Sequence, residues 1–153
     1  MTEEDFKFDA EYGYHFNAMC ECFYSRIDLL LNGVMLLGGS ASAYGAFSVE
    51  AAPAGWGGAA LAACAVVSLL LKPAEKALLH CQAKAASLKL KNRVRPSNLK
   101  ALNTELADLQ ASSPNGIASL QVRAANKTLD SLGYTSGHRP QGFGGWLFGM
   151  LTL

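Results

Sequence analysis

Charged residues are scarce in this sequence: they make up 16% of the 153 residues, while half of the chain is hydrophobic. A soluble domain carries roughly 25% charged residues. The deficit is concentrated between Asp28 and Lys72, where Glu50 is the one charged residue. The length corresponds to about one domain, but the composition divides it into two charged ends and an uncharged middle.

The sequence also lacks the motifs of common catalytic and metal sites. No Gly-rich phosphate loop precedes a Lys-Ser or Lys-Thr pair, no histidines have metal-ligand spacing, and no serine lies in a nucleophile elbow. The cysteines have neither zinc-site spacing nor the density of a secreted disulfide scaffold; they are Cys20, Cys22, Cys64 and Cys81. We therefore expect free thiols in or near a reducing compartment, no metal, no cofactor and no enzymatic activity.

Two uncharged runs predict membrane helices. Residues 29–49 form an uncharged run long enough, at about 1.5 Å per residue, to cross a hydrocarbon layer of about 30 Å. The second run, residues 51–71, is most apolar after Trp56, so its span is expected over residues 56–71. Between them VEAAPAG contains a charge, a proline and a glycine, which favour a turn. We therefore predict an all-α fold with a two-helix transmembrane hairpin and long cytoplasmic helical extensions.

The alternative is a soluble protein that buries both apolar helices in its own core. The Gly, Ser and Ala residues in the middle of the first run favour this alternative, because they make that run only mildly apolar. No cleavable signal peptide is expected, since the first residues are acidic and the apolar run begins well inside the chain.

Basic residues near the predicted spans indicate the orientation. Lys7 and Arg26 precede the first span, the hairpin loop has no lysine or arginine, and a basic collar follows the second span. The collar consists of Lys72, Lys76, Lys84, Lys89, Lys91, Arg93 and Arg95. Because such residues are retained in the cytoplasm, we expect a multi-pass membrane protein with both termini cytoplasmic. A collar facing anionic lipid explains these charges with fewer assumptions than specific nucleic-acid binding.

Small residues four positions apart recur in both spans. The pairs are Gly39 with Ala43, Ser42 with Ala46, and Gly58 with Ala62. Such pairs let membrane helices approach closely. They predict either packing within the hairpin, which is the simpler interpretation, or a homo-oligomer.

The ends of the chain predict further helices, so we divide it into segments 1–27, 28–72, 73–95 and 96–153. The first and third should pair, through an aromatic face on one and an apolar stripe on the other. The aromatic face is Phe8, Tyr12, Phe16, Met19 and Phe23, and the stripe is Leu78, Cys81, Ala85 and Leu88. Acidic residues near the start of the chain and the lysines after residue 72 should favour this pairing.

Two more helices are expected after Pro96. The first should begin at a Ser97 cap and carry a leucine seam, and the second should end at Gly133. The seam is Leu99, Leu102, Leu106 and Leu109, and the second helix has Ala118, Val122, Ala125, Leu129 and Leu132 on one face. Residues 143–153 are apolar but too short to cross a bilayer, so an interface, the membrane surface or a neighbouring subunit should cover them.

The order helix, span, short loop, span and AEKALLHCQAKAA resembles the SLATT domains, which are bacterial two-helix membrane effectors. The residues that carry the resemblance lie before the first span and after the second; they are His15, Tyr24, Arg26, Ala74, Glu75, Lys76, His80 and Ala83. It covers roughly residues 10 to 95, and the chain after Pro96 departs from it. His15 and His80 lack further ligands at suitable spacing, so each is expected to be a structural or interfacial residue rather than a metal ligand.

The resemblance implies an oligomeric effector that forms pores in the inner membrane, or disrupts it, during anti-phage defence or programmed cell death. Its partners would be the lipid bilayer, further copies of itself and a regulatory protein encoded nearby. Two alternatives remain open: a structural or membrane-delivery component of a phage or secretion particle, and a phage holin.

Overall fold

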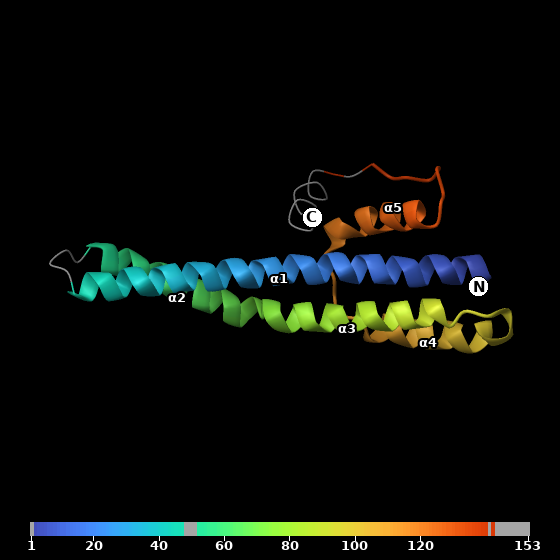
Figure 1. The fold of residues 1–153 in the computed structure, drawn as a ribbon, viewed down its shortest axis with the longest axis horizontal. Helices are drawn as coiled ribbons and strands as arrows, with labels where there is room; N and C mark the ends of the chain where they lie inside the picture. Colours follow the sequence, from blue (N-terminus) through green and yellow to red (C-terminus); the bar gives the residue numbers. More distant parts are fainter. Residues whose placement is uncertain (1, 48–51, 141, 143–153) are drawn as a thin grey trace. The chain divides into compact units, whose positions relative to one another are not determined.

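The structure, a computed structural model, describes residues 2–47, 52–140 and 142 (Figure 1). This part of the chain contains helices and connecting segments but no β-strand, so the predicted all-α fold is confirmed. The helices are α1 (Glu3–Phe47), α2 (Ala52–Leu71), α3 (Pro73–Asn92), α4 (Leu99–Ser112) and α5 (Gln121–Ser131). Short 3-10 turns, Pro96–Asn98 and Ala118–Leu120, precede α4 and α5.

The chain forms two compact units. The helical unit comprises residues 1–23 and 76–153, and the hairpin unit comprises residues 24–75. Helix α1 contributes to both units and continues without interruption through residues 27 and 28, where the sequence suggested a segment boundary. The predicted turn at residues 49–55 lies partly outside the described residues, and α2 already begins at Ala52.

Lys72 separates α2 from α3. Its φ of 45° lies in the left-handed region, and this backbone conformation costs a residue with a side chain about 1–2 kcal/mol. The following Pro73 disfavours a right-handed helical conformation at Lys72, and its own fixed φ suits the first position of a helix. Pro73 therefore begins a new helix rather than kinking a continuous one.

The core of the helical unit lies between α1, α3 and α4. Phe6 and Ala10 of α1 pack with Leu90 of α3 and with Leu102 and Leu106 of α4, all of them buried. Leu99, Leu109 and Val94 pack against this cluster, so the leucine seam predicted for α4 is confirmed. Figure 1 shows α3 and α4 on one side of this part of α1 and α5 on the other.

The helix ends agree with the prediction in one case and not in the other. Gly133 closes α5 with a φ of 81°, and the Tyr134 amide donates to the Leu129 carbonyl at 2.9 Å. Ser97, predicted to cap α4, lies instead inside the preceding 3-10 turn. Asn98 takes the capping position, and its side chain accepts from the Arg95 amide at 3.0 Å.

The buried face of α3 differs from the predicted stripe. Leu78 and Leu88 are 59% and 40% exposed, whereas a face one position earlier is buried. That face consists of Ala77, His80, Ala83, Ser87 and Leu90. The stripe prediction was wrong because small and polar side chains, rather than the largest apolar ones, fit against α1: a Cβ added at Gly13 would lie 3.0 Å from Ser87 Oγ.

The aromatic face of α1 is only partly buried. Met19 and Phe23 are buried as predicted, while Phe8, Tyr12 and Phe16 are half-buried and follow one another along the helix with nearly parallel rings. Three residues that were not predicted to be buried are fully buried: Phe6, Ala10 and Cys20.

Candidate functional site

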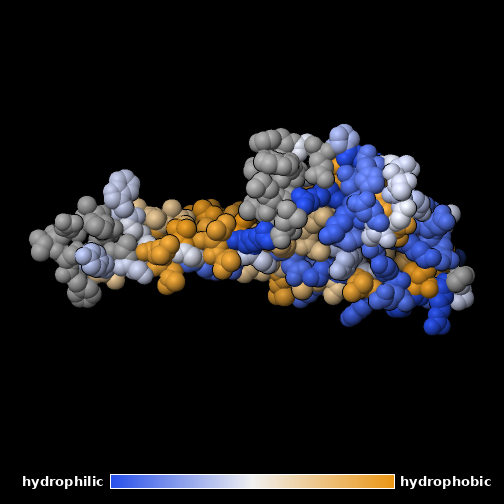
Figure 2. Space-filling model, turned by 45° about the horizontal axis from the view of Figure 1, so that its top comes forward, coloured by the Kyte–Doolittle hydropathy of each residue, from blue (hydrophilic) through white to orange (hydrophobic). Residues whose placement is uncertain are grey.

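The hairpin unit has large aliphatic side chains on its surface. Five leucines, Leu29, Leu36, Leu37, Leu69 and Leu70, are between 71% and 78% exposed. In the same unit Gly38, Gly45 and Gly57 are buried. Figure 2 shows hydrophobic residues gathered on the surface of the hairpin, whereas the surface of the helical unit is mostly hydrophilic. The hairpin thus has small residues inside and leucines outside, the reverse of a water-soluble helix pair.

Helices α1 and α2 approach each other closely at these glycines. A Cβ added at Gly38 would lie 2.8 Å from the Gly57 carbonyl oxygen, which is closer than real contacts allow. A Cβ at Gly39 would lie 3.5 Å from Leu61 Cδ1, and one at Gly58 would lie 3.7 Å from Ser42 Oγ. This backbone-to-backbone packing is typical of helix pairs in lipid, where dispersion and close fit replace the hydrophobic effect.

The predicted packing residues divide between two faces of the hairpin. Gly39, Ser42 and Gly58 lie at the contact between α1 and α2, which is the internal packing weighed above. Ala43 and Ala62 are exposed on the hairpin surface, and the side chain of Ala46 lies outside the described residues. Gly38 and Gly57 were missed, although Gly38 and Ser42 have the same four-residue spacing as the predicted pairs. Oligomer formation through these residues stays a prediction.

Two serines inside the apolar stretch of α1 form hydrogen bonds within their own helix. Ser40 Oγ donates to the Leu36 carbonyl at 2.8 Å, and Ser42 Oγ donates to the Gly38 carbonyl at 2.9 Å. A bilayer core offers no water to take these bonds, so such pairing is what a spanning helix requires. Two helical stretches, within residues 3–45 and 56–92, are long and apolar enough to cross a membrane.

Several residues of the basic collar form ion pairs with acidic residues of the same chain. Lys84 pairs with Glu21 of α1 and Lys91 with Glu11, which supports the predicted pairing of the first and third segments. Arg93 pairs with Glu105 of α4 at 2.7 Å. Lys72 pairs with its neighbour Glu75 at 3.3 Å, Lys76 is half-buried, and Lys89 and Arg95 are exposed.

His80, one of the residues that carry the family resemblance, is fully buried. Its Nδ1 lies 2.8 Å from Asn17 Oδ1, while Asn17 Nδ2 donates to the Gly13 carbonyl at 2.8 Å. Because the carbonyl can only accept, the amide orientation is fixed and Nδ1 is the donor to Asn17. Burial lowers the pKa of His80, and a hydrogen bond with the Asn115 backbone opposes that shift in part.

His15 belongs to a second buried polar group, which joins α1, α3 and α5. Its Nε2 lies 3.3 Å from Glu11 Oε1, and Glu11 also contacts Lys91 and Ser131. Burial lowers the pKa of His15, with Glu11 acting in the opposite direction. Burial raises the pKa of Glu11, but Lys91, Ser131 and His15 outweigh it, so the net shift is downward. Burial therefore disfavours the protonated form of both histidines.

The other residues of the resemblance occupy less distinctive positions. Tyr24 and Arg26 are half-buried in the hairpin unit, and Glu75 is exposed. The described residues contain no group of three or more histidine, cysteine or acidic side chains that could hold a metal ion. All four cysteines are free thiols, and burial raises the pKa of Cys20.

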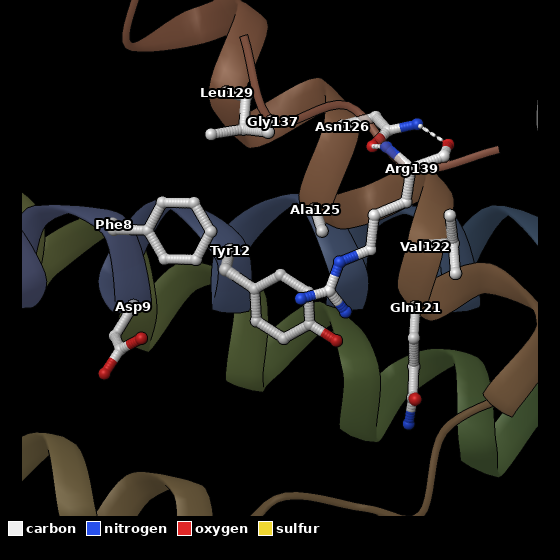
Figure 3. Close-up of a pocket in the computed structure, with 10 residues that line it drawn as sticks. All are labelled: Phe8, Asp9, Tyr12, Gln121, Val122, Ala125, Asn126, Leu129, Gly137 and Arg139. Carbon is white, nitrogen blue, oxygen red and sulfur yellow. Dashed lines mark hydrogen bonds between the residues drawn. The ribbon is translucent and has the colours of Figure 1, made fainter. Parts of the chain in front are cut away.

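The helical unit also contains a cavity of about 450 Å³ between α1, α5 and residues 137–139 (Figure 3). Phe8 and Tyr12 form one wall, with ring centroids 6.5 Å apart and planes 8° from parallel. The opposite wall is fixed by Asn126, whose amide group exchanges two hydrogen bonds, of 2.8 and 2.9 Å, with the backbone of Arg139. No feature of the sequence indicated this cavity.

The chain matches no protein-family model, no curated protein and no solved structure.

Proposed function

We propose that this chain is an oligomeric membrane effector whose hairpin unit inserts into a bilayer and makes it leaky. The observation that carries the proposal is the inverted burial of the hairpin, in which leucines more than 70% exposed surround buried glycines. In water, burying each leucine would be worth about 1.5–3 kcal/mol, so a soluble fold would place these side chains inside.

Lipid is the solvent that makes this arrangement favourable. Acyl chains are as apolar as leucine, so outward leucines cost nothing in a bilayer, while glycines let the two backbones approach. The soluble alternative requires the leucines of α1 and α2 to be shielded by other parts of the chain. In the described hairpin residues they are exposed instead.

The proposed location is the inner membrane, with both termini in the cytoplasm. The support is the distribution of basic residues, since Arg26 and Lys72 flank the spans on one side and the connection at residues 48–55 has none. Trp56 is 81% exposed near that connection, as suits an aromatic residue at the opposite membrane interface.

The effector role is supported by the resemblance to SLATT domains over roughly residues 10 to 95. Ala43 of α1 and Ala62 of α2 are small and exposed, so each is available for a further close helix contact. Assembly of several hairpins would then line a conducting path or thin the bilayer, in anti-phage defence or programmed cell death.

Insertion is tested by expressing the full chain in bacteria and extracting the membranes with alkaline carbonate. The wild type should stay in the pellet. Leu36→Lys places a charge near the middle of the first span, at a cost of about 2.5–3.5 kcal/mol on insertion scales, and should move protein into the supernatant. Leu78→Lys, at an exposed leucine of α3, is the matched control and should stay in the pellet. A wild type that is soluble without detergent would overturn insertion.

Permeabilisation is tested by dye release from liposomes and by membrane potential in cells that overexpress the chain. The wild type should release a small dye and collapse the potential, and Leu36→Lys should do neither. Insertion without leakage would overturn the effector role and favour the structural or delivery component. Release of large dextrans together with the dye would instead favour the holin.

A further inference from the structure

The cavity of the helical unit has an acidic residue at one end and a basic residue at the other. Figure 3 shows Phe8 and Tyr12 side by side along α1, with Asp9 next to Phe8 and the Arg139 side chain extending from the opposite wall toward Tyr12. Val122, Ala125 and Leu129 of α5 complete an apolar middle. An aromatic surface therefore lies between an acidic end and a basic end.

The charged groups at both ends have no partner among the described residues. Neither the Arg139 guanidinium nor the Asp9 carboxylate makes a hydrogen bond or ion pair with another residue in the part of the chain that the structure describes. Burial raises the pKa of Asp9, and the nearby charge of Asp5 adds to this. An adjoining cavity of about 550 Å³ shares Phe8 and Asp9 and adds Glu4 and Asp5, so the acidic end would gain from a hydrogen-bond donor or a cation.

The wall that carries Arg139 is held in place. Besides the two hydrogen bonds between Asn126 and the Arg139 backbone, His138 Nε2 lies 2.7 Å from Asp130 Oδ1. The backbone of residues 138–139 is thus fixed to α5, and the Arg139 side chain projects from a defined point. A volume of about 450 Å³ lies within the range of small-molecule sites.

From this geometry we propose that the cavity binds a planar aromatic small molecule with an anionic group at one edge and an amino group at the other. The ring stacks on Phe8 and Tyr12, the anion accepts from Arg139, and the amine donates to Asp9. Guanidinium and carboxylate each form charge-assisted hydrogen bonds, which are about twice as strong as neutral ones. The proposal concerns the helical unit alone and does not depend on membrane insertion.

The test uses the full chain in nanodiscs, with empty nanodiscs to subtract lipid partitioning. The probe is 6-amino-2-naphthoate, whose fluorescence reports binding; 2-naphthoate lacks the amine, and 2-aminonaphthalene lacks the carboxylate. We expect saturable binding of the first, and affinities lower by about tenfold or more for the other two, as loss of one charge-assisted bond implies.

Substitutions test which residue binds the carboxylate of the probe and which binds its amine. Arg139→Gln should weaken the two naphthoates by about tenfold or more but leave 2-aminonaphthalene unchanged, and Asp9→Asn should weaken the two amines but not 2-naphthoate. Tyr12→Leu should weaken all three probes. Lys127→Gln, an exposed charge of α5 that does not line the cavity, is the matched control and should change none.

Two outcomes would overturn the proposal. One is the absence of saturable binding by every probe at about 1 mM. The other is binding that the variants at residues 9, 12 and 139 leave unchanged, because the probe then occupies another place. Circular dichroism of each variant establishes that the helices remain folded, and Tyr12→Phe, which retains the ring, provides a gentler change at the wall.

Discussion

The two units of this protein bury opposite classes of side chain. The helical unit encloses Phe6 and Leu102 together with a buried carboxylate and two buried histidines. The hairpin unit encloses glycines and leaves its leucines outside. The same continuous helix, α1, takes part in both patterns, so the difference does not come from secondary structure.

A different interaction specifies the packing of each unit. In the helical unit, burial of apolar area is combined with paired polar groups such as His80 with Asn17, which select one arrangement of the helices. In the hairpin unit, the fit of two backbones at Gly38 and Gly57 takes the place of side-chain burial. The first solution suits water and the second suits lipid.

The largest expected effect comes from shortening equivalent leucines in the two units. Leu102→Ala removes a side chain that is 1% exposed from the core of the helical unit, and should lower its free energy of unfolding by about 2–5 kcal/mol. Leu70→Ala shortens a side chain that is 78% exposed, and should leave the folding of both units unchanged. Hydrogen exchange in nanodiscs, read separately for peptides of α2 and α4, measures both.

The same two variants can contradict the assignment of the hairpin leucines to lipid. If Leu70→Ala lowered protection in α2 as much as Leu102→Ala does in α4, the leucines of the hairpin would be core residues. The hairpin would then belong to a soluble fold.

A smaller effect is expected from filling the contact between α1 and α2. Gly38→Leu forces a side chain against the Gly57 backbone and should destabilise the hairpin by about 1–3 kcal/mol. Gly33→Leu is the matched control, because a Cβ there meets no other atom within 4 Å. Protection of α2 amides in nanodiscs should fall for the first variant only. Equal behaviour of the two would show that close approach does not hold the hairpin.

The sequence was informative where one physical rule dominates. Uncharged length predicted the two apolar helices, heptad spacing predicted the α4 seam, and Gly133 predicted the end of α5. It was misleading on α3, where periodicity of large apolar residues pointed to Leu78 and Leu88. The face of α3 that is buried contains Ser87, which packs against Gly13, and His80, which bonds to Asn17. These contacts depend on where α1 lies, and the spacing of residues within α3 does not predict that.

The candidate sites show the same limit. Small-residue spacing located the hairpin contact to within one position but named Gly39 rather than Gly38, because adjacent glycines satisfy the pattern equally. The cavity brings Tyr12 together with Arg139 across more than a hundred residues of sequence. Nothing in local composition indicates such a meeting, since it depends on how α5 packs against α1.

Lowering the pH should destabilise the helical unit but not the hairpin unit, and this effect should be smaller than those of the substitutions above. The pKa values of His15, His80 and Glu11 are all lower in the folded protein than their ordinary values of 6.5, 6.5 and 4.5. A lowered pKa contributes stability above the ordinary value that is lost as the pH falls. The helical unit should therefore lose protection below about pH 6.5, where the histidines begin to bind protons on unfolding, and again below about pH 4.5.

The hairpin should not respond, because residues 29–47 and 56–71 contain no histidine, lysine, arginine or acidic residue. Hydrogen exchange corrected for its intrinsic pH dependence compares the two units between about pH 7.5 and 5.5 in one sample. His80→Gln keeps a donor for Asn17 but removes one titrating group, so it should reduce the loss. Constant protection of α3 over this range would mean that the two histidines are not held neutral by burial. A loss of equal size in α2 would instead mean that the units do not unfold independently, because protonation in one would then be destabilising both.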